Sequence, residues 1–210
     1  MTGLYPGQTT IQQNAIRIRE RLSDVQSLSQ RFMEAGYRAS RIGKIYHYNN
    51  PGDIGTPGRD DPPSWHVALN PIGRDKFAQE RIFTLKPGSY GGTLSWMADP
   101  RSDGEYTDGK VATETAHLLR YHRDSGQPFF LGVGFYRPHT PYVSPTGYFA
   151  RYDTTAIQVP QVPPGYLQSL PPLAQRSVRR DWQQEQHNLP RHLAVQAIQA
   201  YYAAISYVDA

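Results

Sequence analysis

GYRASRIGKIYH, residues 36–47, is the stretch that decides the fold, because it predicts a buried strand with polar side chains at its far end. Residues 37–46 have the pattern of an extended segment, and Lys44 and His47 arrive together at its end. Gly43 stands directly before them, where a missing side chain allows a ligand or a second backbone to approach closely. We therefore expect a site at the end of this strand.

A helix is predicted before this strand. Ser23 is a suitable N-cap, and Gln26 follows three residues later as in a capping box. Gly36 fits the left-handed position that ends a helix. The preceding polar residues, 1–22, predict an arm on the surface.

Composition predicts one domain with a hydrophobic core. The chain has 210 residues, of which 38% are hydrophobic and 12% are aromatic. The net charge of +4 is spread along the chain without a block of Lys and Arg, so nucleic acid is not an expected partner. The sequence has no cysteine, which excludes disulfides and thiolate metal sites within it. No run reaches the roughly 20 apolar residues of a membrane helix, no signal peptide is visible, and the compartment stays open.

The middle of the chain predicts a helix followed directly by a strand. Thr107 or Asp108 is expected to cap a helix that runs to about Arg123 and ends at Gly126. Residues 129–135 are continuously apolar, as expected of a strand covered on both faces. This order is half of a βαβ unit and predicts an α/β fold whose mixed, mostly parallel sheet is flanked by helices. The expected apolar positions of the helix are Val111, Leu118, Leu119 and Tyr121.

The remaining segments are predicted to be richer in loops. Residues 48–104 form a loop-rich insertion, and residues 140–190 form a Pro-rich loop region with a short helix near residues 147–152. A final helix is predicted over about residues 193–208. Its expected buried face consists of Leu193, Ala197, Tyr201, Ala204 and Val208.

Two adjacent carboxylates, Asp60 and Asp61, allow two interpretations. Clustered carboxylates are ligands for hard cations, which suggests a metal pair. Neighbouring aspartates are more typical of a solvated turn. We expect the turn and assign no metal ligand within the chain.

The strand-end residues resemble a known family. The pattern Gly-Tyr, five residues, Gly-Lys-x-x-His resembles the second signature of the sulfatases and is filled here by Gly36, Tyr37, Gly43, Lys44 and His47. PFFLGVGFYRPHTP, residues 128–141, contains an Arg-Pro-His-x-Pro turn that is similar to the later histidine motif of that family. The form GKIYH looks most like the iduronate-2-sulfatase branch when it is followed, as here, by Asp60, Asp61, Pro62, Ser64 and Trp65.

The resemblance implies an alkaline-phosphatase-like α/β fold and, for the complete protein, hydrolysis of sulfate esters of a sulfated carbohydrate or small molecule. In that family a Cys-x-Pro/Ser-x-Arg motif, whose cysteine a formylglycine-generating enzyme converts to the nucleophile, comes just before the segment that matches residues 2–6. We therefore expect residues 1–210 to be a single catalytic domain that is a fragment, incomplete at both ends. The calcium implied by the family would have its ligands outside this chain. Without a cysteine, the chain alone is expected to be inactive.

The resemblance also implies a role for each motif residue. Lys44 and His139 would bind the sulfate together with Arg137, and His139 would protonate the leaving oxygen. His47 would orient the nucleophile or assist its regeneration. We expect residues 39–46 and 129–135 to be parallel neighbours that bring these groups into one pocket.

Two other functions remain open from the sequence. One is a chain that only binds anions or is a truncated product without function. The other is a phosphodiesterase or phosphatase relative, which the two sulfatase-like motifs disfavour. The remaining histidines lack a motif and are expected to be structural; they are His66, His117, His122, His187 and His192.

Overall fold

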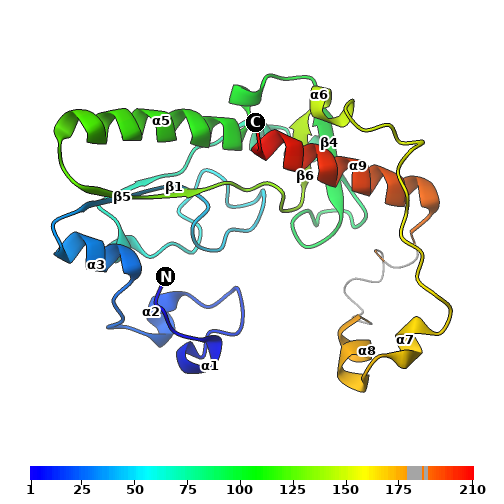
Figure 1. Ribbon diagram of the computed structural model, residues 1–210, viewed down its shortest axis with the longest axis horizontal. Helices are drawn as coiled ribbons and strands as arrows, with labels where there is room; N and C mark the ends of the chain where they lie inside the picture. The colour runs from blue at the N-terminus through cyan, green and yellow to red at the C-terminus, as the bar shows by residue number, and fades with distance from the viewer. Residues whose placement is uncertain (179–185, 187–188) are drawn as a thin grey trace. The chain divides into compact units, whose positions relative to one another are not determined.

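The computed structural model describes residues 1–178, 186 and 189–210, so that His187 and part of the Pro-rich region lie outside the described residues. The chain divides into two compact units, whose elements are labelled in Figure 1. Unit 1 comprises Met1–Gln79 and Asp103–Tyr136, and unit 2 comprises Glu80–Ser102 and Arg137–Ala210.

Unit 1 contains a parallel sheet, sheet A, with strand order β2-β1-β5. Its strands are β1 (Arg38–Gly43), β2 (Val67–Leu69) and β5 (Phe129–Gly134). Its helices are α1 (Pro6–Thr9), α2 (Ile18–Arg21), α3 (Leu28–Glu34), α4 (Arg74–Phe77) and α5 (Thr107–Ser125), with 3-10 turns η1 (Pro62–Ser64) and η3 (Asp103–Glu105). The predicted parallel pairing of the two motif-bearing strands is confirmed, as is the α/β class.

The ends of β1 and β5 meet without any side chain between them. Gly43 lies opposite Gly134 in the parallel register, and the Lys44 N–H donates to the Gly134 carbonyl at 2.8 Å. A Cβ atom on Gly134 would overlap the carbonyl group of Lys44. Glycine at these positions therefore sets how closely the two strand ends approach, and with it the position of Lys44.

Helices α3 and α5 cover opposite faces of sheet A (Figure 1). Phe32 of α3 stacks on Phe130 with ring centroids 4.7 Å apart, and His122 of α5 stacks on Phe129 at 4.6 Å. Neighbouring residues of β5 thus point to different helices, as strand geometry requires. The expectation that this strand is fully covered is wrong, because β5 is an edge strand and Phe129 and Val133 are each 37% exposed.

The capping box of α3 lies one turn later than predicted. Ser27, not Ser23, is the N-cap: its hydroxyl accepts the Gln30 N–H at 3.2 Å, and the Gln30 side chain accepts the Ser27 N–H at 2.9 Å. Ser23 and Gln26 have the same three-residue spacing as Ser27 and Gln30. Ser27, however, is buried, and its hydroxyl oxygen also accepts a hydrogen bond from the Ser64 hydroxyl at 2.7 Å. Gly36 adopts the predicted left-handed conformation, with φ 83°.

Helix α5 begins at Tyr106 as N-cap, not at Thr107 or Asp108. These two side chains instead connect the helix to other parts of unit 1. The Thr107 hydroxyl donates to Asp75 at 2.5 Å, and Asp108 accepts the N–H of Tyr136 at 2.8 Å. Gly126 ends the helix in a left-handed conformation as predicted, and Val111 is buried. Two other predicted apolar positions, Leu119 and Tyr121, are exposed.

Unit 2 contains a mixed sheet, sheet B, in which β3 and β4 are antiparallel and β4 and β6 are parallel. Its elements are β3 (Phe83–Thr84), β4 (Ser95–Asp99), β6 (Tyr142–Pro145), α6 (Thr146–Phe149), α7 (Tyr166–Ser169), α8 (Pro172–Val178) and α9 (Arg191–Val208), and η2 (Gln79–Arg81) stands at the boundary. The loop-rich insertion thus supplies strands to both sheets. In the described part of the chain, no helix is long and apolar enough to cross a membrane.

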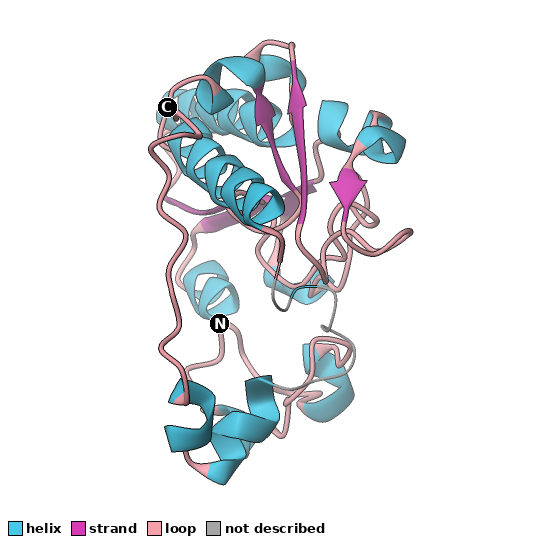
Figure 2. Cartoon of the chain, turned by 90° about the vertical axis from the view of Figure 1, so that its right-hand side faces the viewer, coloured by secondary structure: helices cyan, strands magenta, loops and turns pink. Residues whose placement is uncertain are grey.

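Helix α9 packs on strands β4 and β6, as Figure 2 shows. The predicted helix is confirmed, but its buried face is different from the predicted one. Ala197 and Ala204 are buried as predicted. Tyr201 is 40% exposed, and its ring makes an edge contact with the ring of Tyr142. The buried positions are Val195, Ala197, Ala200, Ala203, Ala204 and Tyr207.

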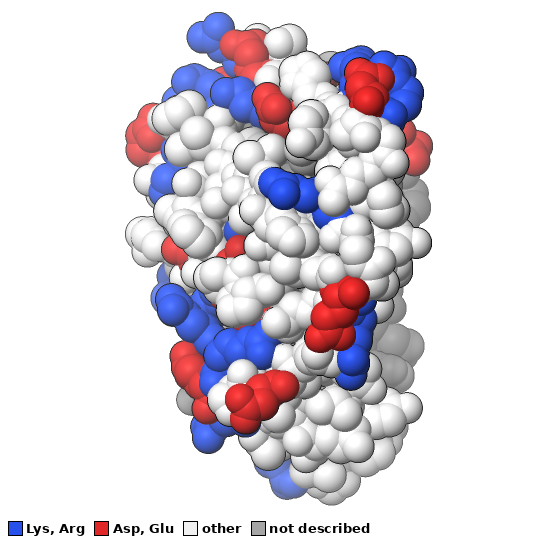
Figure 3. All heavy atoms as spheres, turned by 90° about the vertical axis from the view of Figure 1, so that its left-hand side faces the viewer, with Lys and Arg blue, Asp and Glu red and all other residues white. Residues whose placement is uncertain are grey.

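On the face drawn in Figure 3, basic and acidic side chains are interspersed.

Substituting Gly134→Ala is expected to destabilise unit 1 by about 2 kcal/mol or more, because the new methyl group cannot be accommodated beside the Lys44 carbonyl. Urea unfolding measures the change. Gly7→Ala is the matched control, since a Cβ there meets no atom within 4 Å. Equal stability of the two variants would contradict the close approach of β1 and β5.

His122 predicts a pH dependence of stability. Both ring nitrogens are buried without a hydrogen-bond partner among the described residues. Burial, assisted by the positive charge of Arg38, lowers the pKa of His122 below its ordinary value of 6.5. Below about pH 6.5 the unfolded chain therefore binds a proton that the folded chain resists, so stability falls as pH falls.

We expect the free energy of unfolding to decrease less between pH 7 and pH 5 in His122→Phe than in the unsubstituted chain. The phenyl ring keeps the stack on Phe129 and removes the titrating group. His117→Phe, at an exposed position of the same helix, should retain the original pH dependence. Identical slopes for all three proteins would rule out His122 as the cause.

Candidate functional site

His47 lines a pocket of about 340 Å³ at the end of β1. Tyr46 and Arg59 also line this pocket, together with residues between Met1 and Ile18. The N-terminal arm is therefore part of a pocket, which its polar composition did not indicate. Burial raises the pKa of Tyr46, so this phenol stays neutral and can act only as a hydrogen-bonding group at ordinary pH.

Lys44 directly follows β1 and is half-buried. The hydrogen bond from its backbone N–H to the Gly134 carbonyl fixes its position. His47 is also half-buried, and its carbonyl accepts the Arg59 N–H at 3.1 Å. Sequence analysis predicted both residues at a strand end, and both lie there. Arg59 was missed, because only the fold of the loop brings it back to His47.

Asp60 and Asp61 are not a solvated turn, contrary to our expectation. Asp60 forms a buried ion pair with Arg41 of β1, whose Nε donates to Asp60 Oδ2 at 2.8 Å. Asp61 is 1% exposed and receives Arg19 Nε at 2.8 Å and Nη2 at 2.7 Å. The metal-pair interpretation also fails to match these contacts, because both carboxylates face arginines.

The Arg19–Asp61 pair fixes the N-terminal arm. Burial raises the pKa of Asp61, but hydrogen bonds from Arg19 and Ser64 outweigh it and hold the pKa below its ordinary value. Arg19 also donates to the carbonyls of Ser23 and Val25, at 3.1 and 2.5 Å. One arginine thus connects helix α2, the entry to α3 and the loop after β1.

Arg41→Met is expected to destabilise the protein by about 3–5 kcal/mol, because it leaves the Asp60 charge buried and unpaired. Arg123→Met removes an exposed pair with Asp124 and should cost about 1 kcal/mol or less. Denaturant unfolding compares the two. A small effect at Arg41 would show that Asp60 is solvated after all.

In unit 2, Arg137 and His139 form a tight turn. Arg137 is 4% exposed, and its Nε donates to the Val143 carbonyl at 2.8 Å, so this edge of the guanidinium holds the turn. His139 is exposed, with Nδ1 2.6 Å from the Thr140 carbonyl. Because a carbonyl only accepts, Nδ1 carries the proton in this contact.

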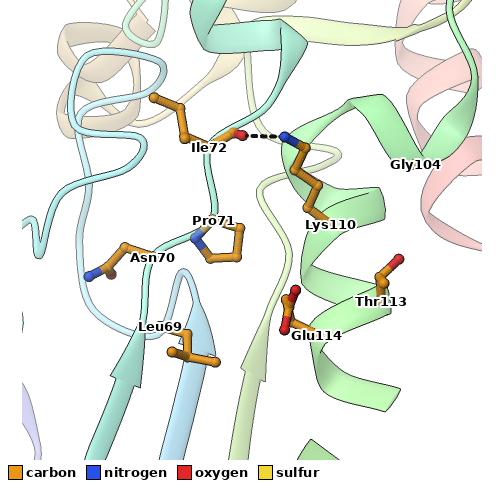
Figure 4. A pocket seen from close by; sticks show the side chains of 8 residues that line it. All are labelled: Leu69, Asn70, Pro71, Ile72, Gly104, Lys110, Thr113 and Glu114. Atoms are coloured by element: carbon orange, nitrogen blue, oxygen red, sulfur yellow. Dashed lines mark hydrogen bonds between the residues drawn. The ribbon is translucent and has the colours of Figure 1, made fainter. Parts of the chain in front are cut away.

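A further pocket of unit 1, about 540 Å³, lies between the end of β2 and the first half of α5 (Figure 4). Lys110 points across it and donates to the Ile72 carbonyl at 2.9 Å. Glu114 also lines the pocket and would repel a sulfate. This pocket is therefore less suited to an anion than the His47 pocket.

Comparison with known proteins agrees with the motifs. The family model "Sulfatase" matches residues 1–210. The chain belongs to the sulfatase family. It is 31% identical over 229 aligned positions to a sulfatase of Formosa agariphila and 26% identical over 224 positions to mouse iduronate 2-sulfatase. Both alignments include the whole chain, but they cover only 42% of the Formosa agariphila protein and 39% of the mouse protein. The chain therefore spans about two fifths of the length of these relatives.

The human iduronate 2-sulfatase is 25% identical over 224 positions, again with the whole chain aligned and 40% of the relative covered. Membership in the sulfatase family implies a divalent metal. Among the described residues, no group of three or more His, Asp or Glu side chains is arranged to hold one. The described side chains thus do not fit that ion.

Proposed function

We propose that the protein containing this chain hydrolyses sulfate esters of a sulfated carbohydrate. One observation carries the proposal. In this sulfatase-family chain, Lys44 and His47 follow the carboxyl end of a parallel strand, and His47 lines a pocket there. In open parallel sheets this edge is where ligands bind. The substrate class is supported by the names of the similar iduronate 2-sulfatases.

In this proposal, Lys44 supplies a fixed positive charge to the sulfate oxygens, where negative charge develops during ester cleavage. His139 gives a proton to the leaving oxygen from Nε2, since Nδ1 is committed to the Thr140 carbonyl. His47 orients the nucleophile, and Arg137 contributes a guanidinium to sulfate binding.

The nucleophile and the metal are proposed to come from outside these 210 residues. The sequence has no cysteine from which a formylglycine-generating enzyme could make the aldehyde. We propose calcium as the divalent ion, with carboxylate ligands elsewhere in the protein. The 210-residue chain alone is then expected to bind sulfate without turning over an aryl sulfate.

In the whole protein, Lys44→Ala is expected to lower kcat/KM for a sulfate ester by about 10²–10³, the usual effect of losing one transition-state charge contact. Lys86→Ala, at an exposed position, is the control and should leave kcat/KM unchanged. An activity insensitive to Lys44→Ala would contradict its role. Turnover by the 210-residue chain, abolished by Lys44→Ala, would show that a different nucleophile exists.

A further inference from the structure

A second polar pocket, about 530 Å³ in volume, lies next to the His47 pocket in unit 1. Residues of the loop after β1, together with Arg17 of the arm, form its walls. Arg59 lines both pockets, and its N–H donates to the His47 carbonyl. A ligand held beside His47 can therefore extend past Arg59 into this second pocket.

The pocket carries an excess of positive charge. Neither Arg17 nor Arg59 forms an ion pair with a described residue, whereas the pocket's Asp60 is neutralised by Arg41. The other carboxylate, Asp53, accepts the backbone N–H and the side-chain amide of Asn49, at 3.0 and 2.9 Å. Two arginines without an ion-pair partner among the described residues thus line the pocket, against one hydrogen-bonded carboxylate. Guanidinium groups match the planar carboxylate and the sulfate oxygens with paired hydrogen bonds.

The loop that carries Arg59 is held in place before any ligand arrives. Gly58 has φ 57° and lies against the ring of Tyr48, where a Cβ atom would come within 2.8 Å. The Thr56 hydroxyl donates to the Asp53 carbonyl at 2.7 Å and accepts the Gly58 N–H at 3.1 Å. Such a loop loses little conformational entropy on binding, which favours affinity.

We propose that the Arg17–Arg59 pocket binds a second anionic group of the saccharide whose sulfate ester lies at Lys44 and His47. The inference rests on the proposed function and narrows its substrate class to saccharides with at least two negative groups. The second group is a carboxylate or a sulfate on the same or the adjacent sugar. Both anions share the chemistry that two guanidinium groups recognise.

Binding of matched disaccharides to the 210-residue chain, measured by calorimetry, tests this proposal. The probes are a sulfated disaccharide containing a uronic acid, its carboxyl-reduced form, and a form with a second sulfate in place of the carboxylate. We expect at least one doubly charged probe to bind about tenfold more tightly than the carboxyl-reduced form, as one charge-assisted contact allows. The preferred probe identifies the second anion.

Arg17→Gln and Arg59→Gln should each remove most of this preference, while leaving the affinity for the carboxyl-reduced probe within twofold. Arg123→Gln, on an exposed part of α5, should keep the preference, and Lys44→Ala should weaken all probes equally. Arg59→Lys retains the charge and should retain part of the preference, which separates loss of charge from loss of folding. Urea midpoints of all variants provide the comparison of stability.

Equal binding of all three probes by the unsubstituted chain, or no binding of any, would overturn the proposal. So would an equal loss of affinity for every probe in Arg59→Gln. Failure of the proposed function gives a different result: the whole protein would not cleave sulfate esters, while the preference that depends on Arg17 and Arg59 would persist.

Discussion

The turn after β1 depends on two buried carboxylates that are neighbours in the sequence and bind arginines from different elements. Asp60 binds Arg41 of the strand itself, and Asp61 binds Arg19 of the N-terminal arm. Removing either arginine leaves a buried carboxylate without its charge partner, which is more costly than losing an exposed pair. Strand, loop and arm are thereby fixed relative to one another inside unit 1, and the His47 pocket exists only because all three are in place.

The arginines of this region divide into two groups by their partners. Arg19 and Arg41 are used to hold the framework, and their charges are balanced by carboxylates. Arg17 and Arg59 line a pocket instead. This division separates stability from recognition: a ligand can interact with the second group without competing for the contacts that keep the loop folded.

Local patterns in the sequence predicted the strand pair, the glycine at the end of α3 and the position of Lys44 and His47. They did not decide between Ser23 and Ser27 as N-cap, because both have a glutamine three residues later and only burial against Ser64 distinguishes them. Nor did they predict the contacts of Asp61, whose partner Arg19 lies 42 residues away. The apolar run of β5 indicated a strand but not its position at a sheet edge. The sharing of one sulfate by Lys44 and His139 stays a prediction.

The paired carboxylates also constrain how the length of this region can change. Side chains of successive residues point in different directions, so Asp60 and Asp61 reach Arg41 and Arg19 only in one register. An insertion or deletion between residues 48 and 55 would displace the buried side chains of Tyr48, Asn50 and Ile54. The same change between Asp60 and Ser64 would present each arginine with the wrong neighbour. Both halves of this loop are therefore expected to be constant in length, the first because of its buried side chains and the second because of its two ion pairs.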